Sequence, residues 1–462
     1  MSFSDRFARL FKAVLPAPFT IAVLLSIFSY FLALIVTRPE ETGYIDYGIQ
    51  IMSFWESGLW TNSLMVFAVQ MMLMLVLGHV LALTKPIEQF IQWSLKYCSN
   101  NAKAVAWISF FTILVALFNW GLGLIFGAIY ARKIAEYAKE KAMPLNYPLV
   151  GAAGYSGLMV WHGGLSGSSL IKVAEEGHLK QLLSSSFSME QLSALPNNIG
   201  LEQTVFSSMN ITTSILLLLI IPGSLYWFAK KFQTKDYKLA EPIQTPVHPE
   251  ILSGAERLDH SKLLAGFFAK VILGAVLVKA FYLNEALLSF FNPNNINFLL
   301  LGLALLLHRH FANFLSALEQ AIGGVSGILI QFPLYFGIMG IMNSSGLVEL
   351  LSGFFVSISN DFSFPIFTFI SAGIVNIFVP SGGGQWAVQG PIIVHSALQL
   401  GIPLYKCIMA LAYGDQLTNM LQPFWALPLL GITGLKAKEI LPYTLVLFLL
   451  GSGIFLLSLM LF

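Results

Sequence analysis

The stretch Phe118-Asn119-Trp120-Gly121-Leu122-Gly123 interrupts one long apolar segment with residues that favour a turn. Basic residues flank this segment on both sides, with Lys103 before it and Arg132 after it. Basic flanks favour the cytoplasmic side of a membrane, so both flanks are expected on one side. A single crossing would separate them, whereas a re-entrant hairpin over 104–130 keeps them together. Non-helical backbone at membrane depth is tolerated where it lines a polar cavity, so the hairpin is a candidate solute path.

The composition is that of a polytopic membrane protein. Hydrophobic residues make up 56% of the chain and charged residues 10%, with a mean hydropathy of +0.75. Soluble domains carry about 25% charged residues. Cys98 and Cys407 are far apart in sequence, which supports neither a disulfide framework nor a cysteine metal site. The net charge of +2 is spread over short loops, so we expect no nucleic-acid partner.

Apolar stretches of about 20 residues predict the crossings of the membrane. About nine transmembrane helices are expected, with the N-terminus in the cytoplasm, no cleavable signal peptide and outer loops at 37–60, 171–204 and 284–295. The predicted crossings are 18–36, 61–83, 145–170, 205–229, 264–283, 296–308, 323–343, 404–430 and 441–461. A second re-entrant hairpin is expected over 362–392.

The same order of parts recurs in the two halves of the chain at an offset of about 258 residues, a hairpin followed by a broken helix. Residues 1–229 form the first predicted repeat, with its broken helix at 145–170. Residues 230–283 form a cytoplasmic linker and a connecting helix. Residues 284–462 form the second repeat, with its broken helix at 404–430. The two units start on opposite sides of the membrane, which is the inverted repeat of many secondary transporters.

The second hairpin bends at Pro380-Ser381-Gly382-Gly383-Gly384-Gln385. Proline and a glycine run cannot continue a helix, and backbone N–H groups at a restarting helix can face an anion. A phosphate-binding loop is rejected, because no Gly-Lys-Ser/Thr follows and the flanks are apolar. Close packing of helices through small residues remains the structural alternative.

The two broken helices hold the polar residues that are expected to carry chemistry. His162 lies among Gly163, Gly164 and Gly167 in the first, and Asp415 precedes Pro423 in the second. An ionisable residue inside a membrane indicates function by default, although helix pairing explains Asp415 and interfacial packing explains His162 almost as well. The repeat offset places His162 near Leu421, so the two residues are expected to act in separate steps.

Neither the hairpins nor the broken helices contain an arginine. An anion would therefore be held by backbone N–H groups, hydroxyls and amides, which suits a monocarboxylate better than a dicarboxylate or tricarboxylate. The predicted substrate-binding residues are Asn119, Gly121, Gly123, His162, Ser166, Ser168, Ser381, Gly382, Gly383, Gln385, Thr418 and Asn419. The predicted residues for a coupling ion or proton are Asp415, Ser156 and Asn376. We expect Asn119, Ser166, Ser381 and Asn419 to face one cavity.

Four motifs resemble the bacterial short-chain fatty acid transporter family across essentially the whole chain: residues 118–127, 161–169, 379–386 and 413–425. The resemblance implies a carrier of butyrate, acetoacetate and similar monocarboxylates in the bacterial inner membrane. The family is similar to the wider ion-transporter superfamily, which implies a homodimer with a scaffold and a mobile, elevator-type transport domain over 104–170 and 362–430. The Ser-Asn-Thr sodium signature of that superfamily is absent from the hairpin tips, so H⁺ and Na⁺ both remain open as coupling ions.

No cofactor and no catalytic residue is expected. An intramembrane enzyme lacks support, because no His-Glu-x-x-His motif and no Ser-Lys or Asp-Asp pair falls at helical spacing within a span. A gated anion channel, or a carrier for another organic anion such as a dicarboxylate, remains the alternative.

Overall fold

The computed structural model describes residues 17–183, 189–231, 237, 239, 254–283, 293–380 and 382–462, and every regular element in these ranges is helical. The first half contains α2 (Pro18–Val36), α3 (Tyr44–Leu59), α4 (Asn62–Ala82), α5 (Lys85–Leu95), α6 (Asn101–Phe118), α7 (Trp120–Glu140), α8 (Tyr147–Tyr155), η1 (Ser156–Met159), α9 (Ser168–Ala174), α10 (His178–Leu183), α11 (Met189–Ala194) and α12 (Ser208–Lys231). The second half contains α13 (Glu256–Asp259), α14 (Lys262–Val278), η2 (Lys279–Leu283), α15 (Pro293–His308), α16 (Phe311–Ile322), η4 (Gly323–Val325), α17 (Ser326–Ser344), α18 (Leu347–Ser357), α19 (Phe364–Phe378), α20 (Gly382–Gln399), α21 (Leu404–Thr418), η5 (Asn419–Leu421), α22 (Pro423–Thr433) and α23 (Ala437–Leu461). The predicted all-α class is confirmed.

Within the described residues, six helices are long and apolar enough to cross a membrane. They cover Phe19–Val36, Leu64–Leu81, Asn101–Phe118, Ser208–Lys231, Lys262–Tyr282 and Ala437–Leu461. α17 and α18 give a further candidate, bent by 67° between Ser344 and Leu347. Asn294–His308, Phe364–Phe378 and Phe424–Thr433 are shorter apolar helices. These helices indicate a multi-pass membrane protein. The number of crossings stays a prediction, because α6, predicted as one arm of a re-entrant hairpin, is itself long enough to cross the membrane.

The predicted outer loop over 37–60 is helical in its larger part, since residues Tyr44–Leu59 form α3, and its placement outside stays a prediction. Its acidic residues Asp46 and Glu56 are exposed, and they had suggested a loop. The opposite face packs on α17, where a Cβ added at Gly58 would lie 2.4 Å from the Phe336 carbonyl oxygen. A helix with one polar face and one small-residue face satisfies both observations.

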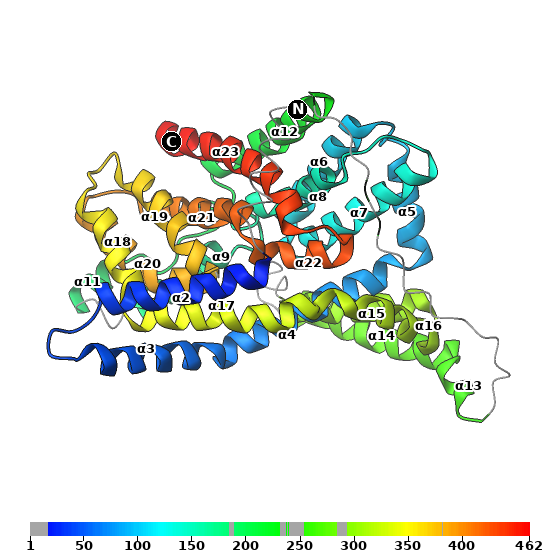
Figure 1. Ribbon diagram of the computed structural model, residues 1–462, viewed down its shortest axis with the longest axis horizontal. Helices are drawn as coiled ribbons and strands as arrows, with labels where there is room; N and C mark the ends of the chain where they lie inside the picture. Colours follow the sequence, from blue (N-terminus) through cyan, green and yellow to red (C-terminus); the bar gives the residue numbers. More distant parts are fainter. Residues whose placement is uncertain are drawn as a thin grey trace.

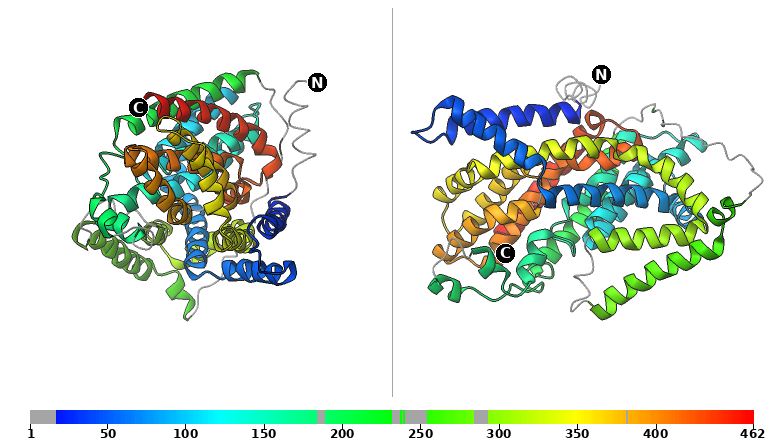
Figure 2. Two further views of the ribbon diagram at one scale, coloured as in Figure 1. Left: turned by 90° about the vertical axis from the view of Figure 1, so that its left-hand side faces the viewer. Right: turned by 90° about the horizontal axis from the view of Figure 1, so that it is seen from below.

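The helices form two groups, seen one above the other in Figure 1. The straight-helix group comprises α2–α4 and α14–α17. The broken-helix group comprises α6–α9, α12 and α19–α23. Helices α12 and α23 pack on α6, α8 and η5 and run side by side in Figure 2. The Thr213 and Ser458 hydroxyls join them at 2.6 Å, which helps to fix this placement.

Both predicted hairpins are present as pairs of helices that fold back on each other. Asn119 adopts an extended backbone between α6 and α7, and its side chain accepts a hydrogen bond from the Leu122 N–H. Gly123 allows the two arms to approach, because a Cβ there would lie 2.7 Å from the Ala116 Cα. In the second hairpin, a hydrogen bond joins α19 and α20: the Gln385 side chain donates to the Ala372 carbonyl at 2.8 Å. Whether either hairpin re-enters the membrane stays a prediction.

Both predicted broken helices are interrupted where glycine or proline stands. After α8, the η1 turn leads into irregular backbone at 160–167, which contains Gly163, Gly164 and Gly167. After α21, the η5 turn ends at Gln422, which is extended before Pro423 starts α22. The two hairpins and two breaks thus lie in one group of helices, whereas their relation as inverted repeats stays a prediction.

Candidate functional site

His162 and Asp415 form a buried pair where the two broken helices meet. The His162 Nδ1 lies 2.5 Å from Asp415 Oδ2, and the side chains are 0% and 1% exposed. His162 comes from the irregular stretch after η1, and Asp415 from the last turn of α21. The expectation that they act apart was wrong. It relied on the repeat offset, which aligned His162 with Leu421, whereas the irregular chain after η1 brings the imidazole to Asp415.

The partners of the imidazole define which nitrogen carries the proton. The Ser169 backbone N–H donates to His162 Nε2 at 2.9 Å, and the Ser169 hydroxyl lies 2.7 Å from the same nitrogen. A backbone amide can only donate, so Nε2 is an acceptor and the proton of the neutral ring sits on Nδ1. The Nδ1–H therefore donates to Asp415, and an ionised Asp415 gives the pair one net negative charge.

Gln416 holds the irregular backbone in place around the pair. Its Oε1 accepts from the His162 N–H at 2.9 Å and from the Gly163 N–H at 3.0 Å. These two amides lie outside any helix, and unsatisfied buried amides are costly. Asn210 of α12 supports the same turn, because its Nδ2 donates to the Gly163 carbonyl at 2.8 Å.

The start of α20 covers the His162–Asp415 pair. A Cβ at Gly382 would lie 2.7 Å from Trp161 Cη2, 3.0 Å from Asp415 Oδ2 and 3.0 Å from His162 Cε1. The Trp161 ring stacks on the imidazole with centroids 4.5 Å apart. The tip of the second hairpin, the two broken helices and the pair therefore meet at one point.

A second buried cluster joins the α19 arm to the end of α21. Asn376 Nδ2 donates to the Asp415 carbonyl, the Thr418 hydroxyl and Asn419 Oδ1 at 2.8–2.9 Å. Gln422 donates to the Asn376 carbonyl. Among the described residues, Asn376 Oδ1, Asn419 Nδ2 and Gln422 Oε1 are buried without a partner. Such atoms can hold a water molecule or a small polar ligand.

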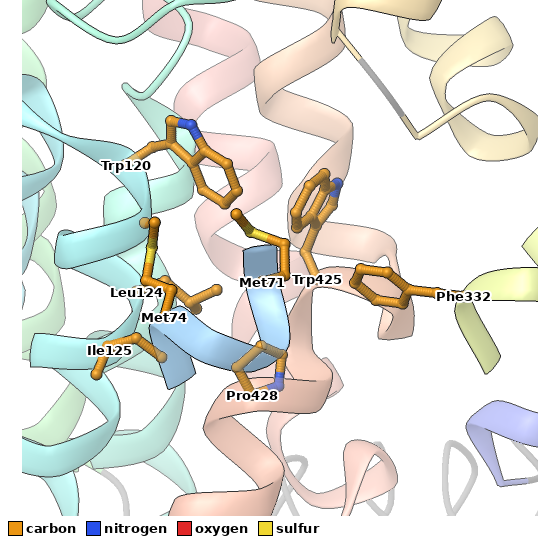
Figure 3. A pocket seen from close by; sticks show the side chains of 9 residues that line it. Met71, Met74, Trp120, Leu124, Ile125, Phe332, Trp425 and Pro428 are labelled. Atoms are coloured by element: carbon orange, nitrogen blue, oxygen red, sulfur yellow. The ribbon is translucent and has the colours of Figure 1, made fainter. Parts of the chain in front are cut away.

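An apolar pocket lies where the two helix groups meet, shown in Figure 3. Met71 and Met74 of α4 and Phe332 of α17 form one side. Trp120, Gly121, Leu124 and Ile125 of α7 with Trp425 and Pro428 of α22 form the other. Trp120 links the pocket to the buried pair. Its ring centroid lies 5.1 Å from that of Trp425 and 5.8 Å from that of Trp161, which stacks on His162.

The other predicted site residues fall in different places. His162, Gly382 and Asp415 come together. A Cβ built at the neighbouring Gly383 would lie 4.0 Å from Ser168 Cβ. Asn376, Thr418 and Asn419 form the amide cluster. Ser166 accepts from the Trp120 N–H, Ser156 bonds to Ser109, and Gly123 and Gln385 lie inside the hairpins. Ser381 lies outside the described residues.

The expected cavity shared by Asn119, Ser166, Ser381 and Asn419 stays a prediction. Each of the three described side chains makes a hydrogen bond within the protein. Residues not predicted as site residues include Ser169, Gln416 and Gln422. Ser169 follows Gly167 by two positions, Gln416 follows Asp415, and Gln422 precedes Pro423. Met71 and Met74 carried no local signal, because they come from an apolar helix without glycine or proline near them, and Pro333 beside Phe332 was not used as a signal.

A metal centre built from charged ligands is not found in the part of the chain that is described. No group of three or more His, Cys, Asp or Glu residues is placed to bind a metal ion there. The unpartnered amide oxygens of Asn376 and Gln422 are the atoms of the second cluster that suit a hard cation.

Comparisons with known proteins agree with the resemblance. Residues 2–462 match the family described as "Short chain fatty acid transporter". Two relatives carry the description "Putative short-chain fatty acid transporter". One is from Escherichia coli (strain K12), 32% identical over 97% of this chain and 96% of its own length, and the other is from Haemophilus influenzae, 34% identical over 96% of both. The crystal structure of the Alcanivorax borkumensis YdaH transporter aligns over 95% of this chain and 97% of its own, with 13% identity and a TM-score of 0.44.

Proposed function

Because the chain belongs to the short-chain fatty acid transporter family and is a transporter, not an enzyme, we propose that it carries short-chain monocarboxylates such as butyrate and acetoacetate. The proposed mechanism is alternating access in a bacterial inner membrane, with the N-terminus in the cytoplasm. The inverted repeats and the homodimer predicted from the sequence are part of this proposal.

The observation that carries the proposal is the apolar pocket between the two helix groups. Its walls are methionine, aromatic and aliphatic side chains from α4, α7, α17 and α22. A short acyl chain gains about 0.8 kcal/mol for each buried methylene, so the lining suits a C4 chain chemically. The cavity of about 10 Å³ is smaller than butyrate, so the proposal requires the pocket to widen when the helix groups move. A site between two groups of helices is exposed to alternate sides when one group moves against the other.

The carboxylate needs donors, and two lie near this pocket. Gly121 lines the pocket in the first turn of α7. The Trp120 and Leu122 N–H groups of this turn already donate to Ser166 and Asn119, so the Gly121 N–H is the backbone donor proposed to face the anion. Trp161 Nε1, next to Trp120, is a buried donor with no partner among the described residues. Lysine and arginine are absent from the pocket lining, which favours one carboxylate over two.

Mobility of the broken-helix group is the second part of the proposal. The transport domain predicted from the sequence, 104–170 and 362–430, is enlarged here by α12 and α23, which pack on it. The straight-helix group would serve as scaffold and as the site of dimerisation.

Counterflow in liposomes tests the carrier. Vesicles containing purified protein are loaded with unlabelled butyrate and diluted into labelled butyrate. A carrier produces a transient internal excess of label, whereas a channel produces only equilibration. Succinate in place of butyrate tests the dicarboxylate alternative. Absence of an excess with butyrate and acetoacetate would overturn the proposed function.

A further inference from the structure

We infer that Asp415 binds the coupling proton, one for each monocarboxylate, and that transport is therefore electroneutral. The inference rests on the proposed function and deepens it by naming the ion and its number. It starts from the hydrogen-bond pattern of the His162–Asp415–Ser169 group.

The imidazole cannot accept this proton without losing a hydrogen bond. Nε2 already accepts from the Ser169 N–H, and Nδ1–H already donates to Asp415 Oδ2. Within the His162–Asp415–Ser169 group, the Asp415 carboxylate is therefore the site that can accept the proton. A proton that arrives from water on the open side binds Asp415, and it leaves to water on the other side. His162 is a positioning residue that keeps Oδ2 in place in both states.

The charge of the site links this proton to an anionic substrate. With Asp415 ionised, the buried pair is negative, and no lysine or arginine contacts it in the hydrogen bonds and ion pairs of the described residues. A carboxylate that enters nearby would add a second negative charge in a medium of low dielectric constant, which is strongly unfavourable. Protonation of Asp415 removes the first charge, so substrate and proton bind together.

The remaining titratable groups on neighbouring elements do not replace Asp415. Lys172 and Glu175, on and just after α9, pair with each other at the surface, at 2.9 Å. His395 on α20 is half-buried and bonds to Gln399. The Tyr155 hydroxyl bonds to the 419 and 422 carbonyls, and the Tyr413 hydroxyl bonds to Asn210.

The tip of the second hairpin controls access to this proton site. Gly382 lies against both members of the pair, with space for a hydrogen atom but none for a methyl group. Water reaches Asp415 when this tip moves away. Protonation and movement of the hairpin are therefore coupled at the same contact.

The test uses proteoliposomes of the full chain and labelled butyrate, with protein-free vesicles subtracted for diffusion of the neutral acid. A gradient of about one pH unit, alkaline inside, limits accumulation of an anion carried with one proton to about tenfold, and the protein should raise the initial rate of this uptake above that of protein-free vesicles. A sodium gradient or a potassium–valinomycin potential alone should support none. Accumulation driven by sodium, or uptake rates that follow the membrane potential, would overturn the inference even if Asp415 variants fail to fold.

Two variants locate the proton. Asp415→Asn should lose accumulation driven by the pH gradient while counterflow persists, and Asp361→Asn, an exposed carboxylate before α19, should behave as the parent. His162→Asn should retain uptake with a shifted pH profile. Accumulation by Asp415→Asn equal to the parent would overturn the assignment. Loss of counterflow in the unmodified protein would instead remove the proposed function.

Discussion

At the scale of single residues, Gly382 sets how closely the second hairpin approaches the His162–Asp415 pair. The missing side chain is what allows contact, since a Cβ would meet Trp161, His162 and Asp415 at 2.7–3.0 Å. Its neighbour Gly383 has no such restriction, because the nearest atom, Ser168 Cβ, is 4.0 Å away. Two adjacent glycines therefore have different roles.

Replacement of these glycines separates the roles. Gly382→Ala should hold the hairpin away from the pair and lower the butyrate uptake rate by about tenfold, as a cost of about 1.4 kcal/mol would do. Gly383→Ala should leave uptake within about twofold. Initial rates in proteoliposomes, normalised to folded protein, provide the measurement. Equal rates for the two variants would contradict the close contact at position 382.

Gln416 gives a prediction on stability. Gln416→Ala removes the acceptor for the His162 and Gly163 amides, and each buried unsatisfied donor costs about 1–3 kcal/mol. The expected result is a lower midpoint in thermal unfolding followed in detergent. Gln399→Ala, at the exposed end of α20, is the matched control and should leave the midpoint unchanged. A Gln416→Ala midpoint equal to that of the control would show that water satisfies both amides.

At the scale of elements, the breaks were predictable and their pairing was not. Asn119, Pro423 and the glycines after Trp161 each prevent regular helix locally, so the sequence places the breaks correctly. The contact between His162 and Asp415 depends on how the chain folds back through 160–167, which no local pattern encodes. The pocket wall from α4 and α17 was missed for the same reason, because lipid-facing and pocket-facing apolar residues look alike in sequence.

We expect the α4 side chains that line the pocket to limit the acyl-chain length of the substrate. Met71 lines the pocket, and Met71→Ala should make room for longer chains. Each additional buried methylene gains about 0.8 kcal/mol, or roughly fourfold in affinity, so hexanoate should improve relative to butyrate. Met72→Ala, one position along the same helix and outside the lining, should not change the ratio. Competition of both acids against labelled butyrate measures it, and an unchanged ratio in Met71→Ala would place the acyl chain elsewhere.

We expect the contact between His178 of α10 and Trp386 of the second hairpin to depend on pH. His178 Nε2 accepts from the Trp386 indole N–H at 3.0 Å. Burial, with a smaller contribution from Lys172, holds the pKa of His178 below its ordinary value of 6.5. The folded state thus binds this proton less readily than the unfolded chain, so the contact is fully present above pH 6.5 and is weakened as the pH falls towards the lowered pKa.

Hydrogen exchange can detect this weakening. Amides at the start of α20 should exchange faster at pH 5.5 than at pH 7.5 after correction for the intrinsic rate. The His178→Gln variant keeps an acceptor but does not titrate, so it should remove the difference. Persistence of the difference in His178→Gln would assign it to another group.

At the scale of the whole molecule, motion between the two helix groups can be tested by a crosslink. A Cβ built at Gly78 of α4 lies 3.5 Å from the Ile125 Cβ of α7, within the range of about 3.5–4.5 Å for a disulfide. Oxidation of Gly78→Cys/Ile125→Cys should stop uptake, and reduction should restore it. Each single variant, treated with the same oxidant, is the control, since native Cys98 and Cys407 are buried. Full uptake by the crosslinked protein would contradict relative movement of α4 and α7.

The bend between α17 and α18 has a mechanical consequence for such movement. α17 packs on α2 and α3, whereas α18 packs on α19 and α20, so the chain passes from one helix group to the other within a few residues. Gly346, with φ of 79°, stands at that passage, where most side chains are strained. Rotation of the backbone there would swing α18 together with the second hairpin. The residue would then act as a hinge, and its freedom would set how far the tip at Gly382 travels from the proton site.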